Sequence, residues 1–417
     1  MRPLLTAEIL AVGTELLTPF RQDTNSLYLA GRLNDAGIDV RWKTVVGDRT
    51  DDLVAVVRQA RQRADVVLAT GGLGPTSDDL TREAVAEVLG LALAEDPRLL
   101  EGIRARFAAR GMTMPEANRR QALVPRGAVV LPNPAGTAPG LWIDAGEGAI
   151  VLLPGPPREM QPMFEAHVEP RLRARSAGRQ VRRRVIKVTG RSESAVEEIA
   201  HPIYAAFGGQ VPIETTILAS PGQIELHLSA RDADLVDIDA ALEAGVSRLA
   251  GALGSAVVST DGRSLEAVVG DRLRERGLRL AVAESCTGGL VLGRLTDVAG
   301  SSGWVLGGIV AYDNAVKIGE LGVAPALLDA HGAVSEPVAR AMARGVGVRL
   351  GADVGLAVTG IAGPSGGSPE KPVGTVVVAV AAPGSETART FVFPGDRATV
   401  RQHSIAAALN LVRVALG

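Results

Sequence analysis

Cysteine is almost absent from this chain, since Cys286 is the single one among 417 residues. A disulfide within the chain is therefore excluded, and we expect a cytoplasmic protein. Aromatic residues make up only 3%, which leaves few platforms for stacking nucleic-acid bases. The formal net charge of −2 gives no global attraction to nucleic acid either. We therefore do not expect nucleic acid as a partner.

Long apolar runs are also missing. Glu8 interrupts the first apolar stretch, and no uninterrupted run is long enough to cross a membrane, so we expect neither a signal segment nor a membrane partner. Apolar residues as such are plentiful, at 46% of a chain of 417 residues. That length and content predict a soluble protein of two or three domains, each with its own core.

The first 70 residues alternate between short apolar runs and amphipathic segments. We predict strands at 8–12, 39–46 and 66–70, with helices at 25–36 and 50–64 between them. This succession is typical of a parallel sheet with helices on both faces, and the fold class is α/β. Ligands of such sheets bind beyond the carboxyl ends of the strands.

A glycine-rich loop follows the third of these strands, at residues 70–79. Its glycines, Gly71, Gly72 and Gly74, would let the backbone approach a phosphate. Thr76 or Ser77 can cap the helix that follows. The loop is neither a Walker motif nor a dinucleotide GxGxxG motif.

Two adjacent carboxylates, Asp78 and Asp79, are expected in the first turn of that helix. There they would either complement the helix dipole or hold a hard cation such as magnesium that bridges the protein and a pyrophosphate. Glu15, after the first strand, is a third candidate oxygen ligand.

Two further loops rich in glycine and proline occur at residues 133–140 and 153–160. The second follows a predicted strand at 149–153, so it should lie on the same ligand-facing edge, with Arg158 or Glu159 able to reach a ligand. The alternative is a proline-rich connection without any ligand.

In the last third of the chain, Ser285 stands between a predicted buried strand at 278–283 and an apolar-periodic segment that Gly288 and Gly289 open. Backbone N–H groups at such a turn can bind a phosphate or stabilise an oxyanion. The structural alternative is that Ser285 or Thr287 only caps the helix.

Lys317 is a candidate base for Ser285, provided that burial lowers its pKa, and the alternative is a solvated charge at a helix start. Cys286, beside the serine, raises a thiolate alternative. We rank it below serine because no histidine stands near it in sequence to activate a thiol.

Long phrases along the chain resemble the CinA (competence/damage-inducible) family over essentially its whole length. In the first half these are GTELL, DTN, TGGLGPTSDDLT, NPAGTAPG and LPGPPREM; in the second they are ESCTGG, YDNAVK, HGAVSEPV and TGIAGPSGGSPEKPVGT. The segment at residues 18–22 departs from the family pattern. The resemblance implies a molybdopterin-binding-like three-layer domain with a parallel sheet at 1–170, a small α+β KH-like domain at 171–255 and an α/β nicotinamide mononucleotide deamidase domain at 256–417.

For the first domain, the resemblance implies hydrolysis of ADP-ribose to AMP and ribose 5-phosphate with a divalent metal. Asp78 and Asp79, with Glu15, would hold the metal, and the Gly71–Gly74 backbone would cradle phosphate. The other residues assigned to substrate binding are Asn25, Asp48, Asn133, Thr137 and Arg158.

For the last domain, the resemblance implies hydrolysis of nicotinamide mononucleotide to nicotinic acid mononucleotide and ammonia, without a cofactor. Ser285 would attack the carboxamide after losing its proton to Lys317, with Tyr312 positioning or relaying it. Backbone N–H groups around Thr287, Gly288 and Gly289 or in the turn at Gly360, Ala362 and Gly363 would stabilise the oxyanion. The backbone of residues 360–367 would supply donors to the substrate phosphate. Arg397 and Arg401 would supply charge to the phosphate, and their alternative is a solvated helix start.

The middle region has a different composition, with an arginine run at 171–184 that reads as a linker or edge. The KH-type Gly-x-x-Gly clamp is missing after Gly190, which argues against RNA binding. The family also implies a homodimer. Two rival functions stay open: a nucleotide-sensing regulatory protein linked to competence or DNA damage, and a first domain that handles molybdopterin.

Overall fold

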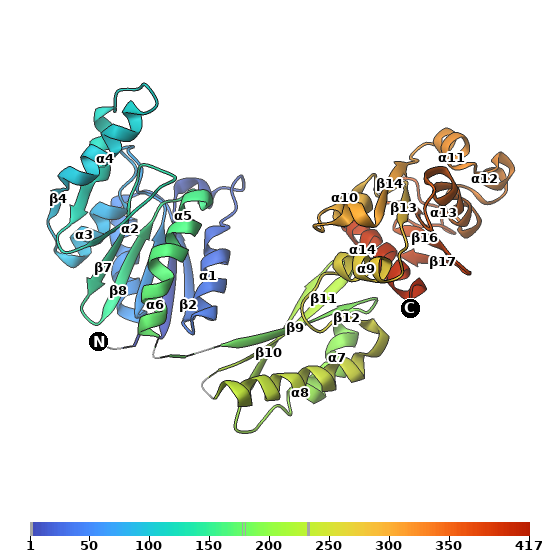
Figure 1. The fold of residues 1–417 in the computed structure, drawn as a ribbon, viewed down its shortest axis with the longest axis horizontal. Helices are drawn as coiled ribbons and strands as arrows, with labels where there is room; N and C mark the ends of the chain where they lie inside the picture. Colours follow the sequence, from blue (N-terminus) through green and yellow to red (C-terminus); the bar gives the residue numbers. More distant parts are fainter. Residues whose placement is uncertain (1–2, 177, 180, 232–233) are drawn as a thin grey trace. The chain divides into compact units, whose positions relative to one another are not determined.

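The computed structural model describes residues 3–176, 178–179, 181–231 and 234–417. The chain forms two compact units, Met1–Arg182 and Arg183–Gly417, which are described separately (Figure 1). None of the described helices is both long and apolar enough to cross a membrane.

The first unit is built on a sheet with strand order β2-β1-β3-β8-β7-β6. The part from β2 to β8 is parallel, whereas β7 and β6 run antiparallel to their neighbours, so the sheet is mixed rather than wholly parallel. Its strands are β1 (Thr6–Val12), β2 (Asp39–Val46), β3 (Val66–Thr70), β6 (Val129–Leu131), β7 (Gly140–Ala145) and β8 (Gly148–Leu153). A short separate ladder pairs β4 (Leu93–Glu95) with β5 (Leu123–Pro125).

Helices cover both faces of this sheet, because side chains alternate between the faces along each strand. Ile9 of β1 packs into a core with α1, α5 and α6, while its neighbour Leu10 packs with α2 and α3 on the opposite face. The helices are α1 (Asn25–Asp35), α2 (Thr50–Arg63), α3 (Thr81–Leu89), α4 (Pro97–Ala108), α5 (Pro157–Met163) and α6 (Glu169–Arg175). The end of the first domain that we predicted at residue 170 falls inside α6.

The second unit begins with a small α+β layer. Its sheet has the order β10-β11-β9-β12, and α7 and α8 pack on one face through a core that includes Ile186, Leu226 and Leu242. The elements are β9 (Arg182–Thr189), α7 (Glu193–Tyr204), β10 (Ile213–Ser220), β11 (Gln223–Ala230), α8 (Leu235–Leu253) and β12 (Val257–Ser259).

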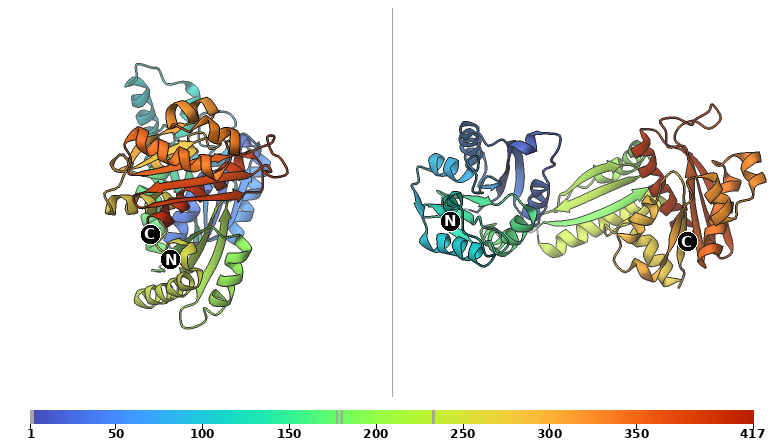
Figure 2. Two further views of the ribbon diagram at one scale, coloured as in Figure 1. Left: turned by 90° about the vertical axis from the view of Figure 1, so that its right-hand side faces the viewer. Right: turned by 90° about the horizontal axis from the view of Figure 1, so that it is seen from above.

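A second α/β sheet follows in the same unit, in the order β14-β13-β15-β16-β17. Val282 of β13 faces a core with α9, α10 and α14, and Ala283 faces one with α11, α12 and α13. Figure 2 shows α11–α13, in orange, along one side of this sheet. The elements are α9 (Leu265–Glu275), β13 (Leu280–Glu284), α10 (Leu290–Thr296), β14 (Val305–Val310), α11 (Asn314–Leu321), α12 (Pro325–His331), α13 (Glu336–Leu350), β15 (Val354–Gly360), β16 (Thr375–Ala382), β17 (Ser385–Val392) and α14 (Arg397–Ala415).

Candidate functional sites

The first site is a cavity of about 380 Å³ at the carboxyl edge of the first sheet. The central strand β1 has β2 on one side and β3 on the other, both parallel to it. The chain order therefore reverses at β1, which is the position where open α/β sheets bind their ligands. The loops that begin at Gly13, Gly71 and Pro154, after β1, β3 and β8, all line the cavity.

The loop after β3 is held tightly against the sheet. Gly71 has a positive φ of 100°, and a Cβ there would lie 2.2 Å from the carbonyl oxygen of Val12. Thr81 donates its hydroxyl to the Gly71 carbonyl at 2.9 Å. Helix α3 begins only at Thr81, with no side-chain cap, so the prediction that Thr76 or Ser77 caps it was wrong.

Asp78 and Asp79 accordingly lie in the loop before α3 and not in its first turn, which removes the helix-dipole alternative. Both line the cavity. Asp79 accepts the backbone N–H of Thr76 at 2.9 Å, and the nearby Thr76 hydroxyl holds the pKa of Asp78 below its usual value. Asp78 is therefore ionised at neutral pH.

Carboxylates dominate the cavity wall, which is lined by Glu15, Asp48, Asp78, Asp79 and Glu159. Among the residues that the structure describes, however, no three acidic, histidine or cysteine side chains converge as a ready-made metal cage. Magnesium commonly takes one or two protein carboxylates and completes its shell with substrate phosphates and water. The residues fit a cation that is shared with a phosphate ligand, and not a cation bound by the protein alone.

The remaining predicted contacts of this site divide into two groups. Asp48, Thr137 and all three glycines line the main cavity. Asn25 lines an adjoining cavity of about 230 Å³, where its amide donates to the Gly155 carbonyl at 2.7 Å and its Oδ1 is buried without a partner.

Asn133 and Arg158 do not reach either of these cavities. The Asn133 amide donates to the Ala138 carbonyl and to Glu159 and accepts two backbone N–H groups, so it organises its own loop. In this structure the side chain of Asn133 is engaged within its own loop, and its assignment as a nucleotide contact stays a prediction. Arg158 is exposed, and its neighbour Glu159 points into the cavity instead.

The second site lies at the corresponding edge of the last sheet. Strand β13 has β14 on one side and β15 on the other, both parallel to it, so this is again the point where the chain order reverses. Ser285 directly follows β13 and is 8% exposed, and its N–H donates to the Val358 carbonyl of β15 at 2.9 Å.

The N-terminus of α10 is occupied by a carboxylate. Glu284 is 1% exposed and accepts the N–H groups of Gly289, Val291 and Leu292 at 2.9, 3.1 and 2.9 Å. The alternative that Ser285 or Thr287 caps this helix is therefore wrong.

Because of this capping, fewer of the predicted N–H groups remain free to stabilise an oxyanion. The N–H of Gly289 is taken by Glu284 and that of Gly288 by the Ser285 carbonyl. Within the described residues, the N–H groups of Thr287, Ala362 and Gly363 have no acceptor. They are the backbone donors that remain for a ligand.

Lys317 lies in α11 and is 1% exposed, so the alternative of a solvated charge is wrong. Its Nζ donates to the carbonyls of Ala311 and Tyr312 at 2.9 and 3.0 Å. Ala311 in turn donates its N–H to the Glu284 carbonyl at 2.7 Å, so the amine is held at the carboxyl end of β14, next to the end of β13 from which Ser285 follows. Burial lowers the pKa of Lys317. A neutral amine has two N–H donors and one lone pair, and these two carbonyls use both donors and leave the lone pair for a proton.

Burial shifts the pKa of the Cys286 thiol in the direction opposite to that of Lys317, because the charged form of a thiol is an anion. Burial raises the pKa of Cys286 to about 11, so the thiol stays protonated at neutral pH. This favours serine over cysteine as the nucleophile.

Both predicted arginines extend from the first turns of α14 toward the site. Arg397 donates to the Gly363 carbonyl at 2.9 Å and to the Tyr312 hydroxyl at 3.3 Å, and Arg401 donates to the Thr287 carbonyl at 2.9 Å. They are therefore not a purely solvated helix start. Tyr312 itself is 62% exposed, so its ring lies at the rim of the site.

Sequence reasoning missed two residues, Gln121 and Glu284, and named Glu159 without assigning it to the site. Gln121 lines the first cavity from a 3₁₀ helix far from any motif, and no sequence signal could have found it. Glu159 was weighed only as an alternative to Arg158. Glu284 was given no role, although an acidic residue shortly before a helix is the kind of side chain that stabilises a helix N-terminus.

Two family models match this chain, one over each of the regions that contain these sites. Residues 8–174 match a family model described as a probable molybdopterin binding domain, and residues 262–416 match the CinA C-terminal domain. A CinA-like protein of Koribacter versatilis is 45% identical over 413 residues, which is 98% of this chain and 99% of that protein. The chain belongs to the CinA family.

Other CinA relatives are similar at comparable levels. A putative competence-damage inducible protein of Symbiobacterium thermophilum is 47% identical over 421 residues, covering 98% of each chain. Among solved structures, the competence/damage inducible protein CihA of Agrobacterium tumefaciens is 41% identical, covers 36% of this chain and 93% of its own, and has a TM-score of 0.36.

Proposed function

We propose that the last α/β domain of this CinA-family protein hydrolyses the carboxamide of nicotinamide mononucleotide to nicotinic acid mononucleotide and ammonia. One observation carries this proposal: a buried lysine amine with a lowered pKa is fixed by two carbonyls at the end of β14, and the adjacent strand β13 ends at a buried serine on the same ligand edge of the sheet. A serine needs such a base to become nucleophilic near neutral pH.

The chemical steps follow from the arrangement. Lys317 Nζ takes the proton of Ser285 Oγ as the oxygen bonds to the carboxamide carbon, and the resulting ammonium returns a proton to the leaving ammonia. Water then attacks the acyl-serine, with Lys317 again as base, and releases the carboxylic acid. The free N–H groups of Thr287, Ala362 and Gly363 are the donors for the oxyanion, and Arg397 and Arg401 supply positive charge for the substrate phosphate.

The test is ammonia release from nicotinamide mononucleotide by the purified protein. We expect Ser285→Ala and Lys317→Met to remain folded and to lose the activity, while the exposed lysine variant Lys43→Met keeps it. Nucleotide binding without any ammonia from the parent protein would instead support a nucleotide-sensing regulatory role.

We also propose that the first domain hydrolyses ADP-ribose to AMP and ribose 5-phosphate with a divalent cation such as magnesium. The supporting observation is the charge of the cavity. Five carboxylates line it, whereas Arg21 is the basic residue among the described residues that line this or the adjoining cavity, and Arg120, outside the lining, donates to the Thr76 carbonyl. A pyrophosphate would be repelled from such a wall unless a cation lay between them.

When bound, that cation would neutralise the phosphates and polarise the scissile bond. Asp78 and Asp79 are the residues that would hold it, and Glu15 and Asp48 line the same wall. The free Oδ1 of Asn25 is an acceptor for a ligand hydroxyl in the adjoining cavity.

AMP formation from ADP-ribose tests this second activity. We expect a chelator to abolish it and magnesium to restore it, and we expect Asp78→Asn to reduce it strongly while the exposed helix variant Asp51→Asn does not. Binding of a pterin with no AMP formed would favour a molybdopterin-handling domain in its place.

A further inference from the structure

A separate cavity of about 420 Å³ lies within the second unit, away from Ser285 and Lys317. One wall is the turn of the β10–β11 hairpin together with the β9–α7 loop. The other wall is formed by β17 and by the middle of α14. Neither proposed activity uses this cavity, and its volume is within the range of small-molecule sites.

The second wall carries three stacked rings. Phe391 and Phe393 have centroids 5.3 Å apart at 12°, and Phe393 and His403 have centroids 5.2 Å apart at 13°. All three line the cavity and are only partly buried. Burial lowers the pKa of His403, so the imidazole is neutral at neutral pH. In a chain with 3% aromatic residues, a continuous stack of this kind is a concentrated surface for a planar ring.

Charged groups line the same cavity at its rim. Arg191 and Arg389 are exposed, and no carboxylate or other hydrogen-bond partner is found for either guanidinium among the described residues. The acidic group in the lining is Glu193. Asn410 accepts from Arg413 through its Oδ1, which leaves its amide N–H groups free to donate. The rim therefore has a net positive charge that suits an anion.

The two walls are held in contact, so the cavity is already formed without a ligand. Gly222 in the hairpin turn approaches α14 so closely that a Cβ would lie 2.5 Å from the Cβ of Ala406. Thr189 donates its hydroxyl to the Gly222 carbonyl at 2.7 Å, and Arg413 of α14 donates to the Ser255 carbonyl at 2.7 Å.

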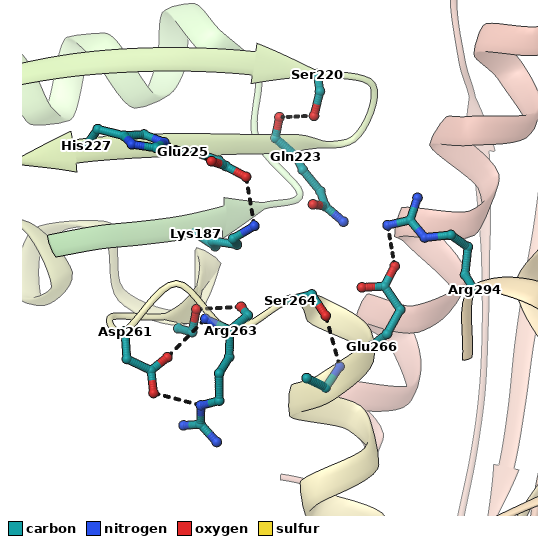
Figure 3. Close-up of polar contacts among 12 residues, drawn as sticks. Lys187, Ser220, Gln223, Glu225, His227, Asp261, Arg263, Ser264, Glu266 and Arg294 are labelled. Carbon is teal, nitrogen blue, oxygen red and sulfur yellow. Dashed lines mark hydrogen bonds and ion pairs between the residues drawn. The ribbon is translucent and has the colours of Figure 1, made fainter. Parts of the chain in front are cut away.

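Figure 3 shows the end of this hairpin, where Ser220 donates to the backbone of Gln223. The side-chain amide of Gln223 extends away from the turn, and no hydrogen bond to it is found within the described residues. Gln223 thus adds a second free amide to the lining. A preformed site of this kind loses little free energy to ordering when a ligand binds.

We propose that this cavity binds a planar aromatic anion of mononucleotide size, with its ring on the Phe391–Phe393–His403 stack and its phosphate between Arg191 and Arg389. Stacking accepts any planar base, whereas two guanidinium groups select strongly for a phosphate. The ligand must therefore carry both parts to bind well.

The test uses the full-length protein and AMP as the probe, with hydrogen exchange measured along the chain, because the first domain could also bind AMP. We expect AMP to protect residues 219–224 and 403–411. The double variant Arg191→Gln with Arg389→Gln should weaken this binding by about tenfold or more, whereas Arg349→Gln, a paired surface arginine, should not.

Two partial ligands separate the ring from the phosphate. Phe391→Leu should weaken AMP and adenosine but not ribose 5-phosphate, and the double arginine variant should weaken AMP and ribose 5-phosphate but not adenosine. Protection confined to the first unit, or equal AMP affinity in the parent protein and the double arginine variant, would overturn the proposal.

Discussion

Burial acts on the pKa values of two side chains of the proposed deamidase site in opposite directions. It raises the pKa of the Cys286 thiol to about 11 and lowers the pKa of the Lys317 amine, so both groups are pushed toward their neutral forms. A neutral thiol is a poor nucleophile, whereas a neutral amine is a competent base. The same desolvation therefore disables the cysteine and prepares the lysine to activate Ser285.

The pH dependence of ammonia release should report this lysine. Because only the neutral amine accepts a proton, kcat/KM should rise with pH and reach a plateau, with a midpoint below the ordinary lysine pKa of about 10.4. Between the two pKa values the unfolded chain binds more protons at Lys317 than the folded one, so this group's contribution to stability also rises with pH there.

Two variants distinguish the titrating group in that profile. Lys317→Arg cannot lose its proton at any accessible pH and should be inactive throughout. Cys286→Ala should keep both the activity and the rising limb. If the rise of kcat/KM with pH disappeared in Cys286→Ala, the thiol and not the amine would be the group that must ionise.

Among helices and strands, the junction between β13 and α10 shows how one carboxylate can organise a catalytic turn. Three N–H groups at the start of α10 converge on Glu284, which is buried at the end of β13. The turn between them therefore has no freedom to re-form around a different cap, and Ser285 is fixed at the sheet edge.

Replacing this carboxylate with an amide should destabilise the fold. Glu284→Gln exchanges a charged acceptor for a neutral one and turns an NH₂ group toward backbone donors, so we expect the free energy of unfolding to fall by about 2 kcal/mol. Urea unfolding measures the change. The exposed variant Glu275→Gln on α9 is the control, and an equal small effect of both substitutions would contradict the capping role.

A comparison of Gly71, in the loop after β3, with Gly90, at the end of α3, separates the cost of a strained backbone from the cost of a steric clash. Gly71 and Gly90 both have positive φ, but a Cβ at Gly90 would meet no atom within 4 Å. Gly90→Ala should cost about 1–2 kcal/mol of unfolding free energy from its left-handed backbone alone. Gly71→Ala should cost about 1–3 kcal/mol more, because the Val12 carbonyl must move. Equal losses in urea unfolding would show that close approach is unimportant there.

The elements themselves were largely predictable from sequence. Strands at 39–46 and 66–70 and helices starting at Asn25 and Thr50 were confirmed. The strand at 66–70 is buried on both faces and so gives a continuous apolar run, and the helices have a clear apolar face. Loop geometry was not predictable. Asp78 and Asp79 precede their helix because the chain first needs residues 71–80 to turn away from the sheet.

Side-chain direction was equally hidden from the sequence. Arg158 and Glu159 are adjacent in sequence at the start of α5, yet successive residues on a helix point about 100° apart, so only Glu159 enters the cavity. Asn133 looked like a ligand contact because asparagine in a Gly/Pro loop suits that role. The structure uses it for the loop's own backbone, as asparagine side chains often do.

For the whole chain, the two proposed sites share one architectural rule on separate sheets. Each lies where a central parallel strand, β1 or β13, has a neighbour on both sides and the chain order reverses. They belong to different compact units, and no described residue lines both.

The two activities should therefore be separable by single substitutions. Ser285→Ala should leave AMP formation within about twofold of the parent, and Asp78→Asn should leave ammonia release equally unaffected, since sites that share no partners usually act additively. Parallel assays of both products on each variant test this. A joint loss in either variant, with folding intact, would reveal coupling between the units.

The acidic wall of the first cavity reverses an ordinary expectation about ionic strength. Proteins that bind phosphates through lysine and arginine lose affinity as salt is added, because the attraction is screened. Here five carboxylates face the ligand, so without divalent cations salt screens a repulsion. The affinity for ADP-ribose should then increase when sodium chloride is raised from about 0.05 to about 0.5 M, and magnesium should restore the usual decrease. Equilibrium dialysis at several salt concentrations would detect that change of sign, which a cavity lined by basic groups would never give.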